Sequence, residues 1–359
     1  MLFDNPQARP LRDLLTTGRF AIVASEKRSN AATGDIFVTG QLRNRDRLIR
    51  FIAGKGLQRP DGNPMSPAEL TATFEEGRVV DIAGKLGEFR GDVQIEIRTA
   101  TAVALTAIDP EEFMPRSRFS TEALRADYDL LVAPLRQPWA GVIAEIVEPR
   151  FRQFAMWPAA RAIHHAWVGG LLEHTLEVAR IALDAAAPVW DGVTAYEPAQ
   201  VFGNRIRRWP SVDLDLLVAA ALLHDIGKLE ELSVGVSTTY SDPGQSLGHI
   251  HLGLFTIRDA CKKLDLDAFD TGRLLHCIAS HHGVPEFGSA IRPATAEALI
   301  LSTADELSAR LGIVSQAVEA ELNGTANWSE RIPALDRRIW LQAGRAAFAL
   351  GVEVQPNDR

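Results

Sequence analysis

The stretch Ala221-Leu222-Leu223-His224-Asp225-Ile226-Gly227-Lys228 sets a polar pair, His224-Asp225, at the end of an apolar helical segment. A histidine or aspartate beside a buried apolar stripe is strongly destabilising unless it is paired or binds a cation, so the pair has a physical reason to be metal ligands. Alone, a His-Asp pair also fits a surface pair or a hydrogen-bonded core histidine. The metal prediction therefore depends on what else the chain offers.

Further candidate ligands lie in other apolar helical segments. All nine histidines of the chain fall between His164 and His282, and this clustering favours one site over scattered core histidines. Imidazole and carboxylate ligands without thiolates suit Mn²⁺, Fe²⁺, Co²⁺, Zn²⁺ or Mg²⁺ rather than a structural zinc site, and the surplus of ligands suits two ions. The predicted metal ligands are His174, His224, Asp225, His249, His281, His282 and Asp305.

The composition is that of an ordinary globular protein, with 46% apolar and 23% charged residues among 359, a length that favours two domains. The chain has no run of about 18 apolar residues and no signal-peptide pattern, which predicts a cytoplasmic protein that does not enter a membrane. Its two cysteines, Cys261 and Cys277, lie in apolar segments and argue against a disulfide framework.

The net charge of −8 argues against non-specific coating of nucleic acid, because neutralised phosphates supply such binding. The charge is uneven, since residues 19–107 hold 13 Lys and Arg against 11 Asp and Glu. This N-terminal region is therefore the better candidate for meeting a polyanion.

Residues 20–108 show a period near two, with β-branched residues and glycine turns, including one at Arg90-Gly91. Such a pattern predicts half-buried antiparallel strands in a small β-barrel. Arg43, Arg45 and Arg47 would lie on one face if this stretch is a strand, although a solvated edge strand looks the same. Residues 52–70, rich in glycine and proline, predict a loop.

Beyond residue 109 the period changes to about 3.6. A helix start is predicted at residues 120–124, and further helical segments at residues 162–187, 212–232, 249–264, 270–280, 294–309 and 335–350. We therefore expect an α+β multidomain protein, with a leader at residues 1–18, a barrel at 19–108, a helical linker at 109–150, an all-α metal domain at 151–320 and a helical extension at 321–359.

His174, the His224-Asp225 pair and Asp305 match the H…HD…D pattern of the HD-domain phosphohydrolases, which the chain resembles. Residues 158–175, PAARAIHHAWVGGLLEHT, are more closely similar to the YhaM-type 3′→5′ exoribonucleases. Similar segments also occur at residues 74–85, 91–95, 236–240, 248–250, 280–283 and 328–336. The resemblance covers about residues 20–340 and is most specific in the helical half.

The resemblance implies an N-terminal OB-fold, an HD domain, and hydrolytic trimming of single-stranded RNA, or DNA, to nucleoside monophosphates. Two divalent ions are expected, with Mn²⁺ foremost. Asp225 would bridge them, with His174, His224 and Asp305 on one ion and His249 with His281 or His282 on the other. A water between two cations loses its proton easily and attacks phosphorus.

Lys228, four residues after His224, is expected to neutralise the scissile phosphate. The alternative is a solvated lysine at a helix C-terminus, where a positive charge is favourable. Arg161, His164 and His165 would contact a substrate phosphate or the terminal ribose, or would cap their helix. Arg43, Arg45 and Arg47 would contact the nucleic acid strand.

Two departures narrow the resemblance. The loop at residues 52–70 replaces a more compact strand pair of the family's barrel. The HD-GYP proteins also share the HD pair, but no GYP follows His282, and Gly170 stands where their trinuclear members have a glutamate. A third metal ion and cyclic-dinucleotide specificity are therefore not expected.

Two alternatives remain open from the sequence. An HD phosphohydrolase could act on a nucleotide or cyclic nucleotide, with the barrel as an assembly module. A binding module with a vestigial site is the other alternative, and the intact ligand set counts against it. The oligomeric state is also open, a homo-oligomer included.

Overall fold

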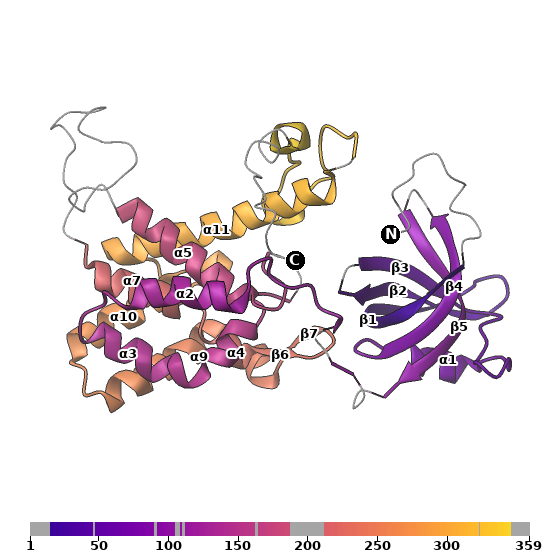
Figure 1. The fold of residues 1–359 in the computed structure, drawn as a ribbon, viewed down its shortest axis with the longest axis horizontal. Coiled ribbons are helices and arrows are strands. Elements are labelled where there is room, and N and C mark those ends of the chain that lie inside the picture. The colour runs from indigo at the N-terminus through magenta and orange to yellow at the C-terminus, as the bar shows by residue number, and fades with distance from the viewer. Residues whose placement is uncertain are drawn as a thin grey trace. The chain divides into compact units, whose positions relative to one another are not determined.

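The computed structural model describes residues 15–45, 47–89, 92–104, 108–109, 112–161, 164–186, 212–322 and 324–345. Contacts divide the chain into two units, each with its own apolar core (Figure 1). One unit is Met1–Arg116 with Ser233–Thr239, and the other is Ser117–Leu232 with Tyr240–Arg359. The predicted α+β class is confirmed.

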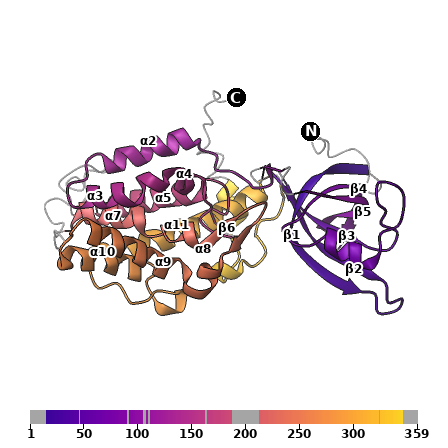
Figure 2. The same ribbon diagram turned by 90° about the horizontal axis from the view of Figure 1, so that it is seen from below.

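The first unit is a closed barrel with strand order β1-β2-β3-β5-β4 (Figure 2). Strands β3 and β5 pair in parallel and close the barrel, while the other neighbours are antiparallel. The predicted OB-like barrel is confirmed. The strands are β1 (Leu15–Ser29), β2 (Ile36–Asn44), β3 (Arg47–Ala53), β4 (Val79–Phe89) and β5 (Asp92–Val103).

The barrel core follows the predicted alternation. Val80, Ile82 and Leu86 of β4 are buried, whereas the intervening Asp81 and Lys85 are partly exposed. Because side chains alternate between the two faces of a strand, one face of β4 fills the barrel interior. Leader residues 1–14 and the predicted turn at residues 90–91 lie outside the described residues, and residues 15–18 already belong to β1.

The predicted loop at residues 52–70 is only partly a loop, because helix α1 (Pro67–Thr73) begins inside it. Ser66 accepts a hydrogen bond from the N–H of Glu69, and the Glu69 carboxylate accepts one from the N–H of Ser66. This capping box, with proline in the first turn, is a helix-start signal that composition alone hides.

The expected arginine face in the barrel is wrong. Arg43 lies in β2, Arg45 in the turn that follows, and Arg47 at the start of β3. Asn44 and Arg47 are paired across this hairpin. Because the chain reverses at Arg45, the three arginines do not share one face of a single strand.

The second unit is built around α7 (Leu214–Leu223), which contacts α3, α5, α10 and α11. Residues 109–150, predicted as a linker, supply α2 and α3, whose Leu124, Tyr128 and Trp139 lie in the same core. The other elements are α2 (Thr121–Val132), α3 (Trp139–Ile146), η3 (Glu148–Arg150), α4 (Phe151–Met156), α5 (Gly170–Ala186), α8 (Lys228–Glu231), α9 (Asp242–Lys263), α10 (Ala268–Ser280), η6 (Pro285–Phe287), α11 (Ala296–Ala320) and η7 (Pro333–Leu335). Strands β6 (Leu232–Val234) and β7 (Thr238–Tyr240) form a two-stranded sheet, most of whose residues are assigned to the first unit.

Several helices are shorter or longer than predicted. The helix expected at residues 162–187 begins only at Gly170, since His165 and Gly169 have positive φ values of 54° and 85°. The helix expected at 212–232 is interrupted after Leu223. In the helix expected at 335–350, residues 341–345 are helical and residues 346–350 lie outside the described part. No helix of the described residues is long and apolar enough to cross a membrane.

Candidate metal centre

The His224-Asp225 pair occupies a tight turn between α7 and α8. Residues 216–223 of α7 are all buried, and the turn is closed by the N–H of Ile226 donating to the Leu223 carbonyl at 3.1 Å. His224 and Asp225 expose 0% and 2% of their surface. The apolar helix thus delivers an imidazole and a carboxylate into the interior, where both need partners.

One group of ligand atoms joins three helices. Nε2 of His174 (α5) lies 3.1 Å from Oδ1 of Asp305 (α11) and 3.3 Å from Nε2 of His224. The His224 Nε2 to Asp305 Oδ1 distance is 3.8 Å. We call His174, His224 and Asp305 the first cluster, and its geometry can hold one cation.

A second cluster comprises His249 of α9 with His281 and His282, which follow α10. One ring nitrogen of each lies within 4.8 Å of the others. The Nε2 atoms of His249 and His281 are buried and have no hydrogen-bond partner. Buried acceptors without a partner are costly, and a cation would satisfy them.

The five histidines of the two clusters each make a contact through Nδ1 that holds the ring. Nδ1 of His224, His281 and His282 donates to the carbonyls of Ala221, Ile278 and Phe287 at 2.7–2.8 Å. His174 Nδ1 lies 3.1 Å from Ser308 Oγ, and His249 Nδ1 lies 3.1 Å from Oε1 of Glu231. Because a carbonyl oxygen only accepts hydrogen bonds, His224, His281 and His282 carry a proton on Nδ1, and their Nε2 atoms are available to bind a cation.

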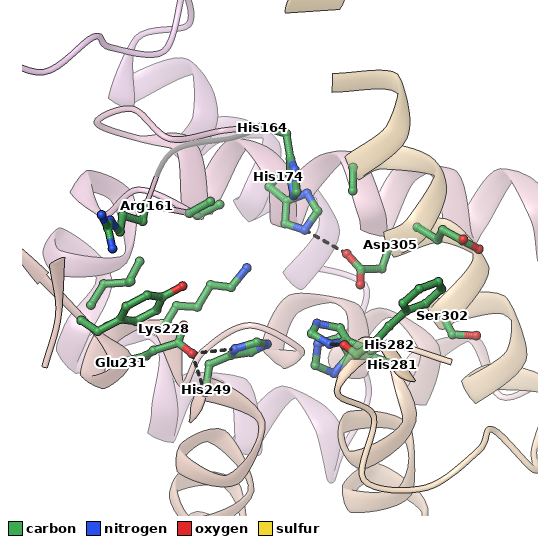
Figure 3. A pocket seen from close by; sticks show the side chains of 17 residues that line it. Arg161, His164, His174, Lys228, Glu231, His249, His281, His282, Ser302 and Asp305 are labelled. Atoms are coloured by element: carbon green, nitrogen blue, oxygen red, sulfur yellow. Dashed lines mark hydrogen bonds and ion pairs between the residues drawn. The ribbon is translucent and has the colours of Figure 1, made fainter. Parts of the chain in front are cut away.

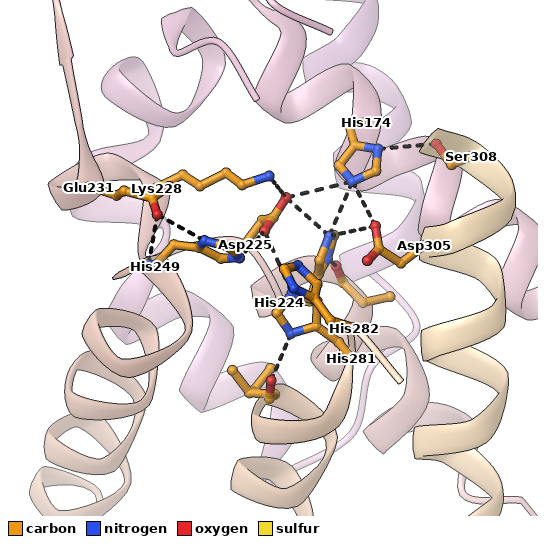
Figure 4. Close-up of polar contacts among 12 residues, drawn as sticks. His174, His224, Asp225, Lys228, Glu231, His249, His281, His282, Asp305 and Ser308 are labelled. Atoms are coloured by element: carbon orange, nitrogen blue, oxygen red, sulfur yellow. Dashed lines mark hydrogen bonds and ion pairs between the residues drawn. The ribbon is translucent and has the colours of Figure 1, made fainter. Parts of the chain in front are cut away.

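Asp225 lies between the two clusters (Figure 4). Its Oδ2 is 3.3 Å from His224 Nε2 and 3.6 Å from His174 Nε2, whereas its Oδ1 is 3.4 Å from His249 Nε2 and 3.8 Å from His281 Nε2. One carboxylate oxygen therefore faces each cluster. Oδ1 is buried without a hydrogen-bond partner, as expected of a ligand.

The electrostatics favour the ligating protonation states of Asp225, Asp305 and His281, whereas Asp225 and Asp305 outweigh burial at His224 and raise its pKa. Burial opposes the charge of Asp225, but Lys228, His224 and His249 outweigh it and hold its pKa well below the usual value. Burial also opposes the charge of Asp305, and the hydrogen bond with His174 outweighs it, so that pKa is lowered too. Burial, aided by His282, lowers the pKa of His281. Charged carboxylates and neutral imidazoles are the forms that bind a cation.

Gly227 allows the second cluster to approach Asp225. A Cβ atom added at Gly227 would lie 2.0 Å from the carbonyl oxygen of His249 and 2.6 Å from the N of Gly253. The turn after α7 therefore packs directly against the backbone of α9. Only glycine permits this approach, which brings His249 to within 3.4 Å of Asp225.

Comparison with known proteins agrees with this geometry. The HD domain family model matches residues 171–310, the region that supplies both clusters. The 3′-5′ exoribonuclease YhaM of Shouchella clausii is 30% identical over 272 residues, which are 75% of this chain and 78% of that protein. The chain belongs to the YhaM 3′-5′ exoribonuclease family. The YhaM protein of Bacillus subtilis is 27% identical over 322 residues, covering 89% of this chain and 92% of that protein.

In this YhaM-family chain a cavity of about 350 Å³ is lined by His174 and Asp305 of the first cluster and by all three histidines of the second (Figure 3). Arg161, His164 and Lys228 line it, as expected of residues that contact substrate. Burial, with His174 and Lys228 nearby, lowers the pKa of His164 to about 4, so this ring is neutral at physiological pH. Lys228 Nζ contacts Asp225 Oδ2 at 2.6 Å.

His165, by contrast, does not line this cavity. It exposes 2% of its surface, and its Nε2 lies 3.2 Å from Oε2 of Glu177. It lines a separate cavity of about 590 Å³ together with Glu173, Glu177 and Ser308. The structure therefore does not support the prediction that His165 contacts substrate alongside His164, because adjacent residues in this non-helical segment face different cavities.

Ser308 and Glu231 hold the candidate ligands His174 and His249 and were not predicted. Ser308 Oγ donates to Glu177 Oε2 at 3.0 Å and contacts His174, which links this ligand to the second cavity. Glu231 accepts from both the backbone N–H and Nδ1 of His249. Ser308 follows Asp305 by three residues and so shares its helix face, a spacing that the sequence does contain. Glu231 offers no comparable signal, because the turn at residues 224–227 interrupts the helical period.

Proposed function

We propose that this protein is a metal-dependent 3′→5′ exonuclease that trims single-stranded RNA, and DNA where offered, to nucleoside monophosphates. Membership in the YhaM family supports the reaction. The observation that carries the proposal is the position of Asp225, with one oxygen toward each cluster of histidines. A shared carboxylate is typical of paired-ion phosphodiesterase sites.

The proposed cofactor is a pair of divalent ions, Mn²⁺ foremost, with Mg²⁺, Co²⁺, Fe²⁺ and Zn²⁺ as alternatives. His174, His224 and Asp305 would hold one ion, His249, His281 and His282 the other, and Asp225 both. Such ions supply a water of lowered pKa and polarise the phosphoryl group. The partnerless Nε2 atoms of His249 and His281 support this assignment.

Gly170 supports a site of two ions rather than three. A Cβ atom at this position would lie 2.0 Å from the carbonyl oxygen of His165. A glutamate therefore cannot occupy position 170 without displacing the chain. The ligand that trinuclear HD-GYP proteins carry there has no room in this fold.

The chain's own cations would hold the substrate. Lys228 and Arg161 line the cavity and would neutralise phosphate charge, which grows at the phosphoryl oxygens as the bond breaks. Burial opposes the charge of Lys228, but the neighbouring Asp225 outweighs burial, so the pKa of Lys228 is raised and the ammonium stays charged. His164, being neutral, would donate a hydrogen bond to phosphate or ribose.

The barrel would bind the part of the single strand that has not yet reached the metal site. OB-folds track single strands with basic and aromatic residues, and Arg43, Arg45 and Arg47 are gathered at one hairpin. A hairpin tip offers fewer contacts than the strand face expected from the sequence. We therefore assign these arginines a supporting role.

The test uses single-stranded RNA and DNA labelled at either end, incubated with Mn²⁺, with Mg²⁺ or with EDTA. A 3′→5′ exonuclease shortens the 5′-labelled strand stepwise and releases the 3′ label as a mononucleotide, and EDTA stops both. The cavity of about 350 Å³ also suits a free nucleotide, which favours the alternative of a small-nucleotide hydrolase. Hydrolysis of nucleotides or cyclic nucleotides without shortening of either strand would support that alternative.

A further inference from the structure

Two large aromatic side chains line the cavity without being covered by the fold. Tyr240 exposes 42% of its surface and Phe287 exposes 63%, and both border the space that the metal ligands share. An exposed aromatic ring in a cavity of charged groups adds nothing to the apolar core. Such a ring marks a place where another flat, apolar group can pack.

Phe287 is fixed to the second cluster through its backbone. It ends the η6 turn, and the left-handed Gly288 (φ 94°) closes that turn. The Phe287 carbonyl accepts the hydrogen bond from Nδ1 of His282 at 2.8 Å. The backbone of Phe287 is therefore tied directly to a proposed metal ligand.

Tyr240 is linked to the second cluster through β7 and Glu231. It ends β7, and the next residue, Ser241, donates its N–H to the Glu231 carbonyl at 2.9 Å. The Glu231 carboxylate in turn binds His249. Both aromatic residues are thus fixed relative to the histidines rather than carried on free loops.

The remaining lining residues suit any of the nucleobases without discriminating among them. Apart from charged groups and the histidines, it consists of small or apolar residues, namely Ala159, Ala160, Leu232, Ser302 and Ala309. Small-molecule sites have volumes of roughly 300–1,000 Å³, so a cavity of about 350 Å³ holds one nucleotide rather than a length of strand. Stacking on an aromatic ring is tolerant of sequence because every base has a π-face.

We propose that Phe287, with Tyr240 lining the same cavity, forms a nucleobase-binding subsite that stacks on the base of the 3′-terminal nucleotide while its phosphate lies at the metal centre. This inference rests on the proposed exonuclease function and adds the group that holds the leaving nucleotide. It explains how a site dominated by charge would engage RNA without reading its sequence.

The test compares two RNAs that differ only at the 3′ end, one with an ordinary terminal nucleotide and one with a base-free terminal ribose. We expect Phe287→Ala to lower kcat/KM for the ordinary RNA about tenfold, the scale of one lost base stack. The same substitution leaves the rate on the base-free RNA unchanged, because that RNA has no base to stack. Phe287→Trp restores the rate on the ordinary RNA, and Phe287→Leu does not.

Phe269→Ala is the matched control, because Phe269 of α10 is 74% exposed and does not line this cavity. It should leave both rates unchanged. Equal losses on the two RNAs with Phe287→Ala, or no loss on either, overturn the subsite while leaving the exonuclease intact. If the wild-type protein shortens neither RNA from its 3′ end, the proposed function fails, and the subsite fails with it.

Discussion

Replacing Gly227 with alanine tests whether the close approach of α9 builds the second cluster. The backbone at Gly227 is helical (φ −64°, ψ −17°), so alanine fits the local conformation and only the added methyl group matters. That methyl would lie 2.0 Å from the His249 carbonyl oxygen, whereas ordinary contacts begin at 3.4 Å. The part of α9 around His249 must therefore move away, and its imidazole moves with it.

We expect Gly227→Ala to destabilise the fold by about 1–3 kcal/mol, the usual effect of overpacking. Activity should fall about 100-fold, because displacing a catalytic group by about 1 Å has that effect. Calorimetric titration with Mn²⁺ should show weakened binding at the site that includes His249. The thermal midpoint and the rate of RNA trimming complete the measurement.

Gly253→Ala is the matched control at the same interface, since its Cβ would have no neighbour closer than 3.4 Å. It should retain near-normal metal binding and activity. If Gly227→Ala binds Mn²⁺ and trims RNA like the wild type, the approach of α9 to Asp225 does not depend on glycine, and the reasoning is refuted.

Four further outcomes follow from the site. Asp225→Asn should abolish trimming and weaken Mn²⁺ binding while the circular dichroism spectrum stays unchanged, and normal turnover in excess metal would exclude the bridge. Ser308→Ala should weaken metal binding about 10- to 100-fold through His174, with turnover recovered at saturating metal, whereas Thr303→Ala should not. Lys228→Ala should lower kcat more than it raises KM, and a change in KM alone would limit this lysine to binding. Arg45→Ala should flatten the salt dependence of RNA binding by about 0.7 in the log–log slope, and an unchanged slope would remove it from the interface.

The sequence predicted the fold class and the family because the decisive signals are local. The period-two pattern in β4 and the His224-Asp225 pair after an apolar helix each occupy a few consecutive residues. The seven proposed ligands do converge in space, and their roles as ligands stay a prediction that metal analysis would test.

The sequence could not show features that depend on distant segments. The reversal at Arg45 separated three arginines that a strand would have aligned, and the positive φ at His165 sent its side chain to a different cavity from that of His164. Neither Arg45 nor His165 has a glycine or proline next to it that would predict the change of direction. Phe287 gave no signal either, because one phenylalanine in a short turn looks the same whether exposed or buried.

The five imidazoles anchored at Nδ1 bear on how the proposed site would select its ions. Ordering a free side chain at a binding site costs about 0.5–1.5 kcal/mol of conformational entropy. Here folding fixes each ring, through carbonyls, Ser308 and Glu231, before any ion arrives. An ion bound by these residues would meet a preorganised cage that adjusts little to it. Discrimination among divalent ions in such a cage comes from ionic radius and coordination geometry, and less from the intrinsic affinity order of the metals.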